Sequence, residues 1–340
     1  MATIRIIESQ QRDLWNRFVL ASPESTYFHL FEWTKVIEQT YGMDTRFLGA
    51  FEGETLIAVL PAVITKKGGS KAVSLAFGTY GGWLFAPGAD AGEVRVAFMQ
   101  FLAGERVTQL ENRQIGDPPS GIPADQVTQR TLLARQPEEL WKRLDPKVRN
   151  QVRKAQKEGL VARWGLNQLE DFFSVYSVNM HYLGTPPHPR SFFSAMIEAF
   201  PELVELLTIR LDDKPLAAML LMKFKRQLAD PWAASLREYA SLCPNMLMYW
   251  EAMKYGCERG FEEFDLGRSR MGSGPFKFKG QWGAKAIPLN YQVVSMDGQG
   301  KLNSHPPSAS PLLPWFGRLW RLVPLKMSSS FSSVVRRRLP

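Results

Sequence analysis

The chain has little cysteine and histidine and no long hydrophobic run. Two cysteines in 340 residues exclude a disulfide-stabilised scaffold, and Cys243 and Cys257 lack the spacing of metal ligands. The longest uncharged run, 72–89, contains four glycines and a proline. A membrane-spanning helix needs roughly 20 mostly apolar residues, so this run is predicted to form a strand, a tight turn and a second strand.

Several functional motifs are also missing. The N-terminus has no basic region followed by an apolar run and a cleavage site, so no signal peptide is predicted. We therefore expect the protein to lie in the reducing cytoplasm, and peripheral contact with the inner membrane is compatible with this location. The sequence has no Gly-x-Ser-x-Gly elbow, no P-loop and no dinucleotide fingerprint. The four histidines show no metal-binding spacing, so no metal site is predicted.

Positive charge is present in excess, but it is unevenly distributed. The formal net charge is +9, and residues 301–340 carry seven basic and no acidic residues. Residues 142–157 carry seven more, with Asp145 as the single acid. The rest of the chain is therefore mildly acidic, which does not fit a protein that coats DNA. The two basic segments predict two separate contacts with anionic partners.

The first basic segment has the spacing of a helix face. Arg149, Arg153 and Lys157 are four residues apart, and Asp145-Pro146 has the form of a helix start. Arginine pairs with phosphate oxygens through two hydrogen bonds, so the stripe suits a phosphate-bearing molecule such as a nucleotide-linked precursor, CoA or tRNA. The alternative is an ordinary solvated helix face.

The second basic segment is the tail, where Trp315, Phe316 and Trp320 alternate with arginines. That composition suits the interface of an anionic membrane. A strap packed on the body of the protein is the alternative, and the prolines argue against one long helix.

The hydrophobic pattern predicts the same order of elements twice: a strand, helices, a β-meander, a helix and a strand. In the first third we expect strands at 3–7, 45–51, 55–65, 73–85 and 107–115 and helices at 11–20, 28–41 and 91–102. A loop is predicted around Pro118–Pro123. Further on we expect strands at 128–133, 204–211, 216–224, 228–235, 261–266 and 289–295, and helices from Asp145, at 166–182, 190–200 and 245–259. Two tandem copies of one α/β fold are the economical interpretation.

Several motifs together resemble the FemAB-like proteins. They are Val148-Arg-Asn-Gln-Val-Arg-Lys-Ala, Met180-His-Tyr-Leu-Gly-Thr-Pro, Phe264-Asp-Leu-Gly-Arg-Ser-Arg and Phe276-Lys-Phe-Lys-Gly-Gln-Trp-Gly-Ala, with Phe28-His-Leu-Phe-Glu-Trp and Tyr80-Gly-Gly in the first third. The chain looks most similar to the branch associated with exosortase and PEP-CTERM exopolysaccharide systems. The resemblance covers nearly the whole chain.

This resemblance implies two tandem GNAT-type acyltransferase domains, each a mixed twisted sheet flanked by helices. We place the N-terminal domain at 1–125, the C-terminal domain, with most of the site, at 126–300, and the tail at 301–340. The resemblance also implies transfer of an acyl or aminoacyl group onto an amine. Known relatives attach amino acids from aminoacyl-tRNA to peptidoglycan precursors. The helical arm by which some relatives contact tRNA and a strict acyl-CoA signature are both missing, so the donor stays open.

Two segments of the C-terminal half are candidates for the catalytic site. The loop 238–245 precedes a helix, where free N–H groups can hold an anion or a developing oxyanion. Within it, Glu238 is a candidate base, Tyr239 a phenol donor and Asn245 a helix cap or anion contact. Asp265 ends an apolar strand and needs a partner, for which Arg268, Lys277 and Lys279 are available. These groups either bind substrate and stabilise its carbonyl oxygen or form a buried ion pair.

Other residues complete the candidate site. His181 lies at a helix end and is a candidate acid or base, although a helix C-terminus alone favours histidine. His29 heads a helix and either lines the site or only caps it. The family motifs add Thr185, Trp282 and Tyr80 as substrate-contacting residues.

The sequence therefore predicts an acyltransferase that makes an amide on a cell-envelope precursor related to peptidoglycan or exopolysaccharide. Its partners would be a phosphate-bearing or lipid-linked precursor, tRNA as a further option, and an anionic membrane at the tail. No cofactor is expected to be permanently bound, because aminoacyl-tRNA or acyl-CoA acts as co-substrate. Two alternatives remain: an acyl-CoA-dependent N-acyltransferase acting on an amino sugar or exopolysaccharide intermediate, and an inactive module that binds tRNA or phosphate.

Overall fold

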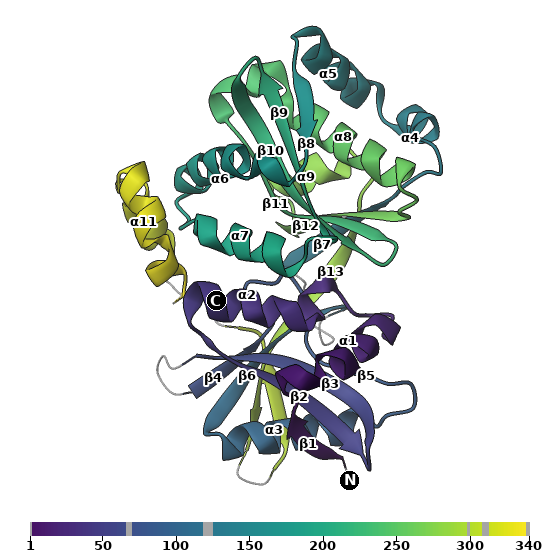
Figure 1. Cartoon of the computed structure of the whole chain (residues 1–340), viewed down its shortest axis with the longest axis vertical. Helices are drawn as coiled ribbons and strands as arrows, with labels where there is room; N and C mark the ends of the chain where they lie inside the picture. Colours follow the sequence, from purple (N-terminus) through teal and green to yellow (C-terminus); the bar gives the residue numbers. More distant parts are fainter. Residues whose placement is uncertain (1, 66–69, 118–124, 298–299, 308–312, 338–340) are drawn as a thin grey trace. The chain divides into compact units, whose positions relative to one another are not determined.

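The chain forms two compact units in this computed structural model, which describes residues 2–65, 70–117, 125–297, 300–307 and 313–337. Unit 1 comprises residues 1–124, 289–310 and 337–340, and unit 2 comprises 125–288 and 311–336 (Figure 1). The chain passes from unit 1 to unit 2 at residue 125 and returns to unit 1 at residue 289, and residues 311–336 belong to unit 2. The predicted loop at 118–123 lies outside the described residues.

Unit 1 is a mixed sheet in the strand order β1-β2-β3-β4-β6-β13. These strands are β1 Thr3–Ile6, β2 Asp44–Glu52, β3 Thr55–Thr65, β4 Ser70–Ser74, β6 Val107–Ile115 and the second part of β13 Lys285–Met296; β5 Leu84–Phe85 pairs with β3, and β14 Leu302–His305 with β13. All pairs are antiparallel except β4 with β6. The run 72–89, expected to form a strand, a tight turn and a second strand, forms β4 and β5, and Leu75 and Phe77 adopt positive φ between them.

Helices cover both faces of the unit 1 sheet, as strand alternation requires. On β2, Phe47 stacks on Phe31 of α2, while its neighbour Leu48 faces the opposite side and packs in one cluster with Phe98 of α3. The helices are α1 Arg12–Ala21, α2 Phe31–Tyr41 and α3 Ala91–Gly104. Helix α2 ends at Gly42, whose positive φ is the expected left-handed C-terminal residue.

Unit 2 has the strand order β13-β7-β12-β11-β10-β9-β8, with one parallel pair, β11 with β12. The strands are β7 Gln126–Leu132, β8 Val161–Trp164, β9 Val204–Leu211, β10 Lys214–Phe224, β11 Gln227–Ser235, β12 Glu263–Arg270 and the first part of β13. Each unit thus has three antiparallel strands, a crossover helix and a parallel fourth strand. The predicted repetition of one α/β fold is therefore present.

Two helical layers enclose the unit 2 sheet (Figure 1). The core on one side combines α8 with α4 and α5; the aromatic rings of α6 and α7 pack on the other, where Phe193 contacts Trp232 of β11. The helices are α4 Pro137–Arg143, α5 Pro146–Lys157, α6 Leu169–Leu183, α7 Arg190–Ala199, α8 Pro244–Glu258, α9 Gly274–Gly280, α10 Leu313–Trp320 and α11 Leu325–Arg336. The short helix α9 was not expected from the sequence. The tail forms two short helices, as its prolines indicate.

Candidate functional site

The parallel strands β11 and β12 separate after three paired residues. Their last pair is Ala229 with Asp265, although β11 continues to Ser235 and β12 to Arg270. Beyond this pair, the register of β12 with β7 shifts between Asp265 and Arg268, and Gly267 adopts a φ of 72°. The backbone of β12 therefore turns away from β11 at Leu266 and Gly267. Asp230 of β11, through its carbonyl oxygen and its side chain, lies beside Gly267 at this point.

Three buried charged side chains gather where the strands separate: Asp230 of β11, Asp265 of β12 and Lys279 of α9. A Cβ atom added at Gly267 would lie 3.4 Å from the Asp230 Oδ1 atom and 3.9 Å from the Lys279 Nζ atom. Asp230 and Lys279 thus both lie next to Gly267. Among the described residues of unit 1, no acidic or lysine side chain is buried.

Asp265 is held rigidly by the neighbouring strand and its own loop. It accepts hydrogen bonds from the Thr128 hydroxyl at 2.6 Å, the Arg130 Nε at 3.0 Å and the Gly267 N–H at 2.8 Å. The expectation that Arg268, Lys277 or Lys279 would supply its direct partner is therefore wrong. Arg130 occupies that place because β7 pairs with β12 and sets Arg130 directly opposite Asp265. Asp265 is a structural anchor for the turn at Gly267.

Asp230 is in a different state: in the described structure neither of its buried carboxylate oxygens has a hydrogen bond of regular geometry, although the Tyr249 hydroxyl lies close to it. Burial raises the pKa of Asp230 to about 7. Lys279 and the Tyr249 hydroxyl on α8 act in the other direction and lower this pKa. Burial together with Asp230 raises the pKa of Tyr249 well above its ordinary value. A carboxyl group with a pKa near neutrality can gain and lose a proton during a reaction.

Lys279 points into this site from α9. Its ammonium donates to the carbonyl oxygens of Gly267 at 3.0 Å and Arg268 at 2.9 Å. Burial lowers the pKa of Lys279, whereas Asp230 and Asp265 raise it. An ammonium has three N–H donors. Two are used by the turn, and the third is available to a bound oxygen.

The loop predicted to carry a base is exposed. Glu238 and Tyr239 lie in the short helix Arg237–Leu242, where both contact Lys214 at the surface, Glu238 at 3.4 Å. Asn245 was expected to cap the next helix, but α8 begins at Pro244 and its N-cap is Cys243, in a left-handed conformation. Proline at the first position displaces the start of the helix, which makes Asn245 its second residue.

The remaining predicted residues are divided among several places. Arg268 and Lys277 are exposed near Lys279, whereas Trp282 is buried and packs on Tyr249. The Nδ1 atom of His181, on the last turn of α6, is buried without a partner, and Thr185 follows that helix.

On α5, Arg153 lies over the Trp141 ring and is exposed, while the Arg149 Nε is buried without a partner. In unit 1, the His29 ring accepts the Thr26 N–H and donates to the Gly82 carbonyl, and Tyr80 is buried.

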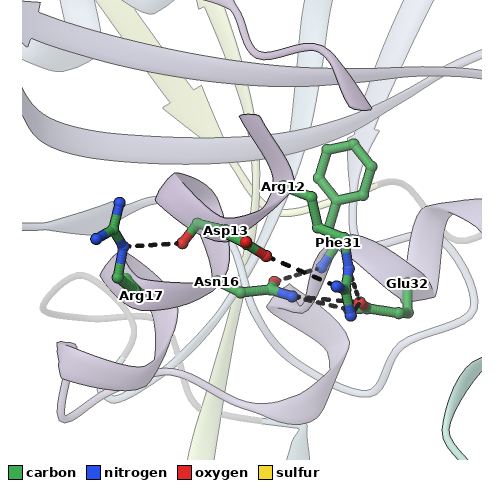
Figure 2. A network of polar contacts seen from close by, with 6 residues as sticks. All are labelled: Arg12, Asp13, Asn16, Arg17, Phe31 and Glu32. Atoms are coloured by element: carbon green, nitrogen blue, oxygen red, sulfur yellow. Dashed lines mark hydrogen bonds and ion pairs between the residues drawn. The ribbon is translucent and has the colours of Figure 1, made fainter. Parts of the chain in front are cut away.

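A second polar cluster, in unit 1, joins α1 to α2 (Figure 2). The Asn16 side chain accepts the Phe31 N–H at 3.0 Å and donates to Glu32, which also pairs with Arg12. The Asn16 side chain thus supplies a partner to a backbone N–H in the first turn of α2, which is a structural role for the cluster. Among the described residues, no three histidine, cysteine or acidic side chains gather as metal ligands, and no helix is long and apolar enough to cross a bilayer.

Sequence reasoning missed Asp230 and Tyr249. Asp230 had a signal, since a lone carboxylate followed by proline interrupts an otherwise apolar strand. Tyr249 had none, because a tyrosine in an apolar helix is an ordinary core residue.

Comparison with known proteins supports this architecture. A family model described as an acetyltransferase (GNAT) domain matches residues 143–280, which include Asp230, Tyr249, Asp265 and Lys279. No curated protein matches the chain.

Among solved structures, FemX is similar with 15% identity over 84% of this chain and 95% of its own, at a TM-score of 0.64. A tandem GNAT protein from the clavulanic acid biosynthesis pathway is similar with 10% identity over 91% of this chain and 100% of its own, at a TM-score of 0.57.

The C-terminal domain of a putative lysylphosphatidylglycerol synthetase from Agrobacterium fabrum is similar with 12% identity over 86% of this chain and 93% of its own, at a TM-score of 0.54. The predicted fold, two tandem GNAT-type domains with mixed twisted sheets flanked by helices, is confirmed.

Proposed function

We propose that the chain is an acyltransferase that forms an amide on an amine of a cell-envelope precursor, with its catalytic site in unit 2. The observation that carries the proposal is the pair of opposite charges, Asp230 and Lys279, at the point where β11 and β12 separate. Such pairs of buried groups with shifted pKa values are typical of functional sites.

The site has the groups that direct amide formation requires. In the reaction, the amine nitrogen attacks the carbonyl carbon of an ester or thioester, a C–N bond forms, and the bond to the alcohol or thiol leaving group breaks. Asp230 takes the proton released by the amine and passes it to the leaving oxygen or sulfur, which departs as the alcohol or thiol and leaves Asp230 as the carboxylate. The free N–H of Lys279 stabilises the negative charge that develops on the carbonyl oxygen.

Tyr249 and Asp265 have positioning roles in this scheme. Tyr249, on α8, lies beside Asp230 and would limit the access of water to that carboxyl group. Asp265 fixes the turn whose carbonyl oxygens hold Lys279. Glu238, the base expected from the sequence, is exposed and paired with Lys214, so Asp230 is the better candidate.

The envelope precursor is proposed from the family resemblance and from the likeness to FemX and to a lysylphosphatidylglycerol synthetase domain. In this proposal the acceptor is related to peptidoglycan or exopolysaccharide, in the PEP-CTERM-associated branch, and the reaction occurs at the cytoplasmic face of the inner membrane. The exposed Arg153 and its neighbours on α5 would bind phosphates of the donor or acceptor.

An acyl-CoA-dependent N-acyltransferase is the second candidate, favoured by the acetyltransferase family match over residues 143–280. Its acceptor would be an amino sugar or exopolysaccharide intermediate. A module that only binds tRNA or phosphate is the non-enzymatic alternative; the buried Asp230 argues against it, because a buried carboxyl with a raised pKa costs stability that binding alone does not require.

The donor can be identified by incubating the purified protein with labelled aminoacyl-tRNA, acetyl-CoA or longer acyl-CoAs and an envelope extract. We expect an amide product with one donor class and a rate that rises with pH through about 7, as Asp230 ionises. Asp230→Asn should lower that rate by about 100-fold or more. Binding of a donor without any product would contradict the enzyme and support the binding module.

A further inference from the structure

The tail of the chain is seated on unit 2 by one side of its two helices. Gly317 of α10 lies against Gly184, so closely that a Cβ atom at Gly184 would be 2.4 Å from the Gly317 carbonyl oxygen. Trp320 is buried and stacks with Phe316. In α11, which lies beside α6 (Figure 1), the Arg336 guanidinium donates to the Pro186 carbonyl at 3.0 Å. The tail thus packs on unit 2, as the strap that the sequence left open beside membrane contact would do.

The other side of the same helices is exposed and apolar. Fourteen large hydrophobic side chains are exposed in the described part of the chain, and nine of them belong to the tail or to α6. This concentration exceeds the scattered exposure that is normal for a protein surface. More than half of each of the following tail side chains is exposed: Trp315, Leu319, Leu322, Phe331 and Val334.

Positive charge is interleaved with these apolar side chains. Arg318 lies over the Trp315 ring at 5.3 Å and, like Arg321, is exposed. At the end of α6, the Arg237 guanidinium lies over the exposed Tyr182 ring at 4.0 Å. Residues 311–340 contain six basic and no acidic residues, and one of the six, Arg336, faces the body. Because Arg318 lies beside Trp315 and Leu319, the exposed side of α10 is apolar, aromatic and cationic at once.

We propose that the outward side of α10 and α11 is a docking surface for a lipid bilayer with anionic headgroups. Tryptophan and leucine side chains enter the boundary between headgroups and acyl chains, and the arginines remain at the level of the phosphates. A partner protein would need acidic side chains at fixed positions opposite each arginine. A bilayer needs only anionic headgroups, because these move freely to the arginines. The inward side keeps the helices on unit 2, so the whole body would be held at the membrane. This inference does not depend on the acyl transfer reaction.

Sedimentation of the full chain with vesicles tests the docking surface. We expect binding to vesicles of phosphatidylcholine and phosphatidylglycerol, much weaker binding to phosphatidylcholine alone, and release by salt. The double substitution Leu319→Ala and Arg318→Gln should weaken binding by roughly tenfold, because it removes one apolar and one cationic contact.

The control is the double substitution Leu20→Ala and Arg17→Gln on α1, which removes the same two exposed residue types and the same charge (Figure 2 shows Arg17). It should bind vesicles like the original protein, and circular dichroism should show that both variants are folded. Absence of vesicle binding, equal binding to both lipid compositions, or equal loss in the two variants would overturn the proposal.

Discussion

Asp230 and Asp265 show how two aspartates on neighbouring strands acquire different chemistry. Asp265 has hydrogen bonds from Thr128, Arg130 and a backbone N–H, so its charge is compensated by fixed donors. Asp230 is equally buried, but its neighbours Tyr249 and Lys279 compensate its charge only in part, and burial therefore raises its pKa to about 7. One carboxylate is suited to hold a turn, and the other to exchange a proton.

Replacing Asp230 by asparagine should stabilise the protein at high pH, although it removes the proposed base. The unfolded chain ionises this group near its ordinary pKa of 3.8, whereas the fold holds its pKa at about 7. The folded state therefore binds the extra proton between these values, and stability falls as the pH rises through them. The cost above about pH 7 is at most about 4 kcal/mol, and asparagine avoids it.

Chemical denaturation of the two proteins at about pH 4 and about pH 8 measures this effect. We expect a gain for Asp230→Asn at the higher pH and little difference at the lower one. The exposed turn substitution Asp213→Asn is the control and should change neither value. A variant that is less stable at both pH values would mean that Asp230 is charged and well paired in the fold.

At the scale of elements, the sequence predicts those whose signals are local. The strand at 107–115 and the meander strand at 204–211 have the predicted bounds, because neither contains glycine or proline and turn-forming residues flank both, with Gly116 after the first and Asp212-Asp213 after the second. Helix α9 was missed because Gly274 and Pro275 are typical of a loop, although Ser273 caps the helix and proline suits its first turn. Between β4 and β5 the strand ends were not predicted, because nothing local reveals the positive φ of Leu75 and Phe77.

The site itself was predicted only where a family motif marks it. Lys279 and Asp265 lie in such motifs and are in the site, whereas the partner of Asp265 depends on which strand pairs with β12. That pairing joins Arg130 to a residue 135 positions away, and no local pattern encodes it. Asp230 meets Tyr249 and Lys279 for the same reason, through the packing of α8 and α9 against the sheet.

The seating of α10 depends on the absence of a side chain at Gly184. Gly184→Ala would place a methyl group 2.4 Å from the Gly317 carbonyl oxygen, so α10 must move away from α6. Trypsin should then cleave faster at Arg318 and Arg321 than in the original protein. Cleavage can be followed by mass spectrometry of the released tail.

Gly260→Ala is a matched control for this change. Gly260 has a φ of 76° and Gly184 one of 71°, so alanine is strained by roughly 1–2 kcal/mol at either position. A Cβ atom at Gly260 meets nothing within 4 Å. Faster cleavage in Gly184→Ala alone identifies the contact with α10, and equal cleavage in both variants would show that backbone strain, not the contact, holds the tail.

At the scale of the whole molecule, the two units share one order of strands but differ in chemistry. In unit 1 the segment after β4 packs into the core, with the Gly81 N–H bonded to the Arg113 carbonyl and the Trp33 indole to the Ala76 carbonyl. In unit 2 the corresponding position holds Asp230, beside Lys279. The buried charges of the described chain thus lie in one copy of the repeated fold, which assigns catalysis to unit 2 in our proposal.

The basic charge of the chain also has two locations in unit 2. One is the α5 stripe, proposed to bind phosphates, and the other is the outward side of α10 and α11, proposed to bind anionic lipid. An enzyme that modifies a lipid-linked precursor would use both, since its donor and acceptor carry phosphate and its acceptor lies in the membrane.

The measurement that tests the account most directly is the transfer rate of Lys279→Met. Methionine keeps the length and packing of the lysine side chain but removes the charge that would stabilise the carbonyl oxygen. We predict a fall in kcat/KM of about 100-fold or more, with the fold retained. The control, Lys254→Met on the exposed side of α8, should transfer at the original rate. Undiminished transfer by a folded Lys279→Met protein would contradict the assignment of the catalytic site to the point where β11 and β12 separate.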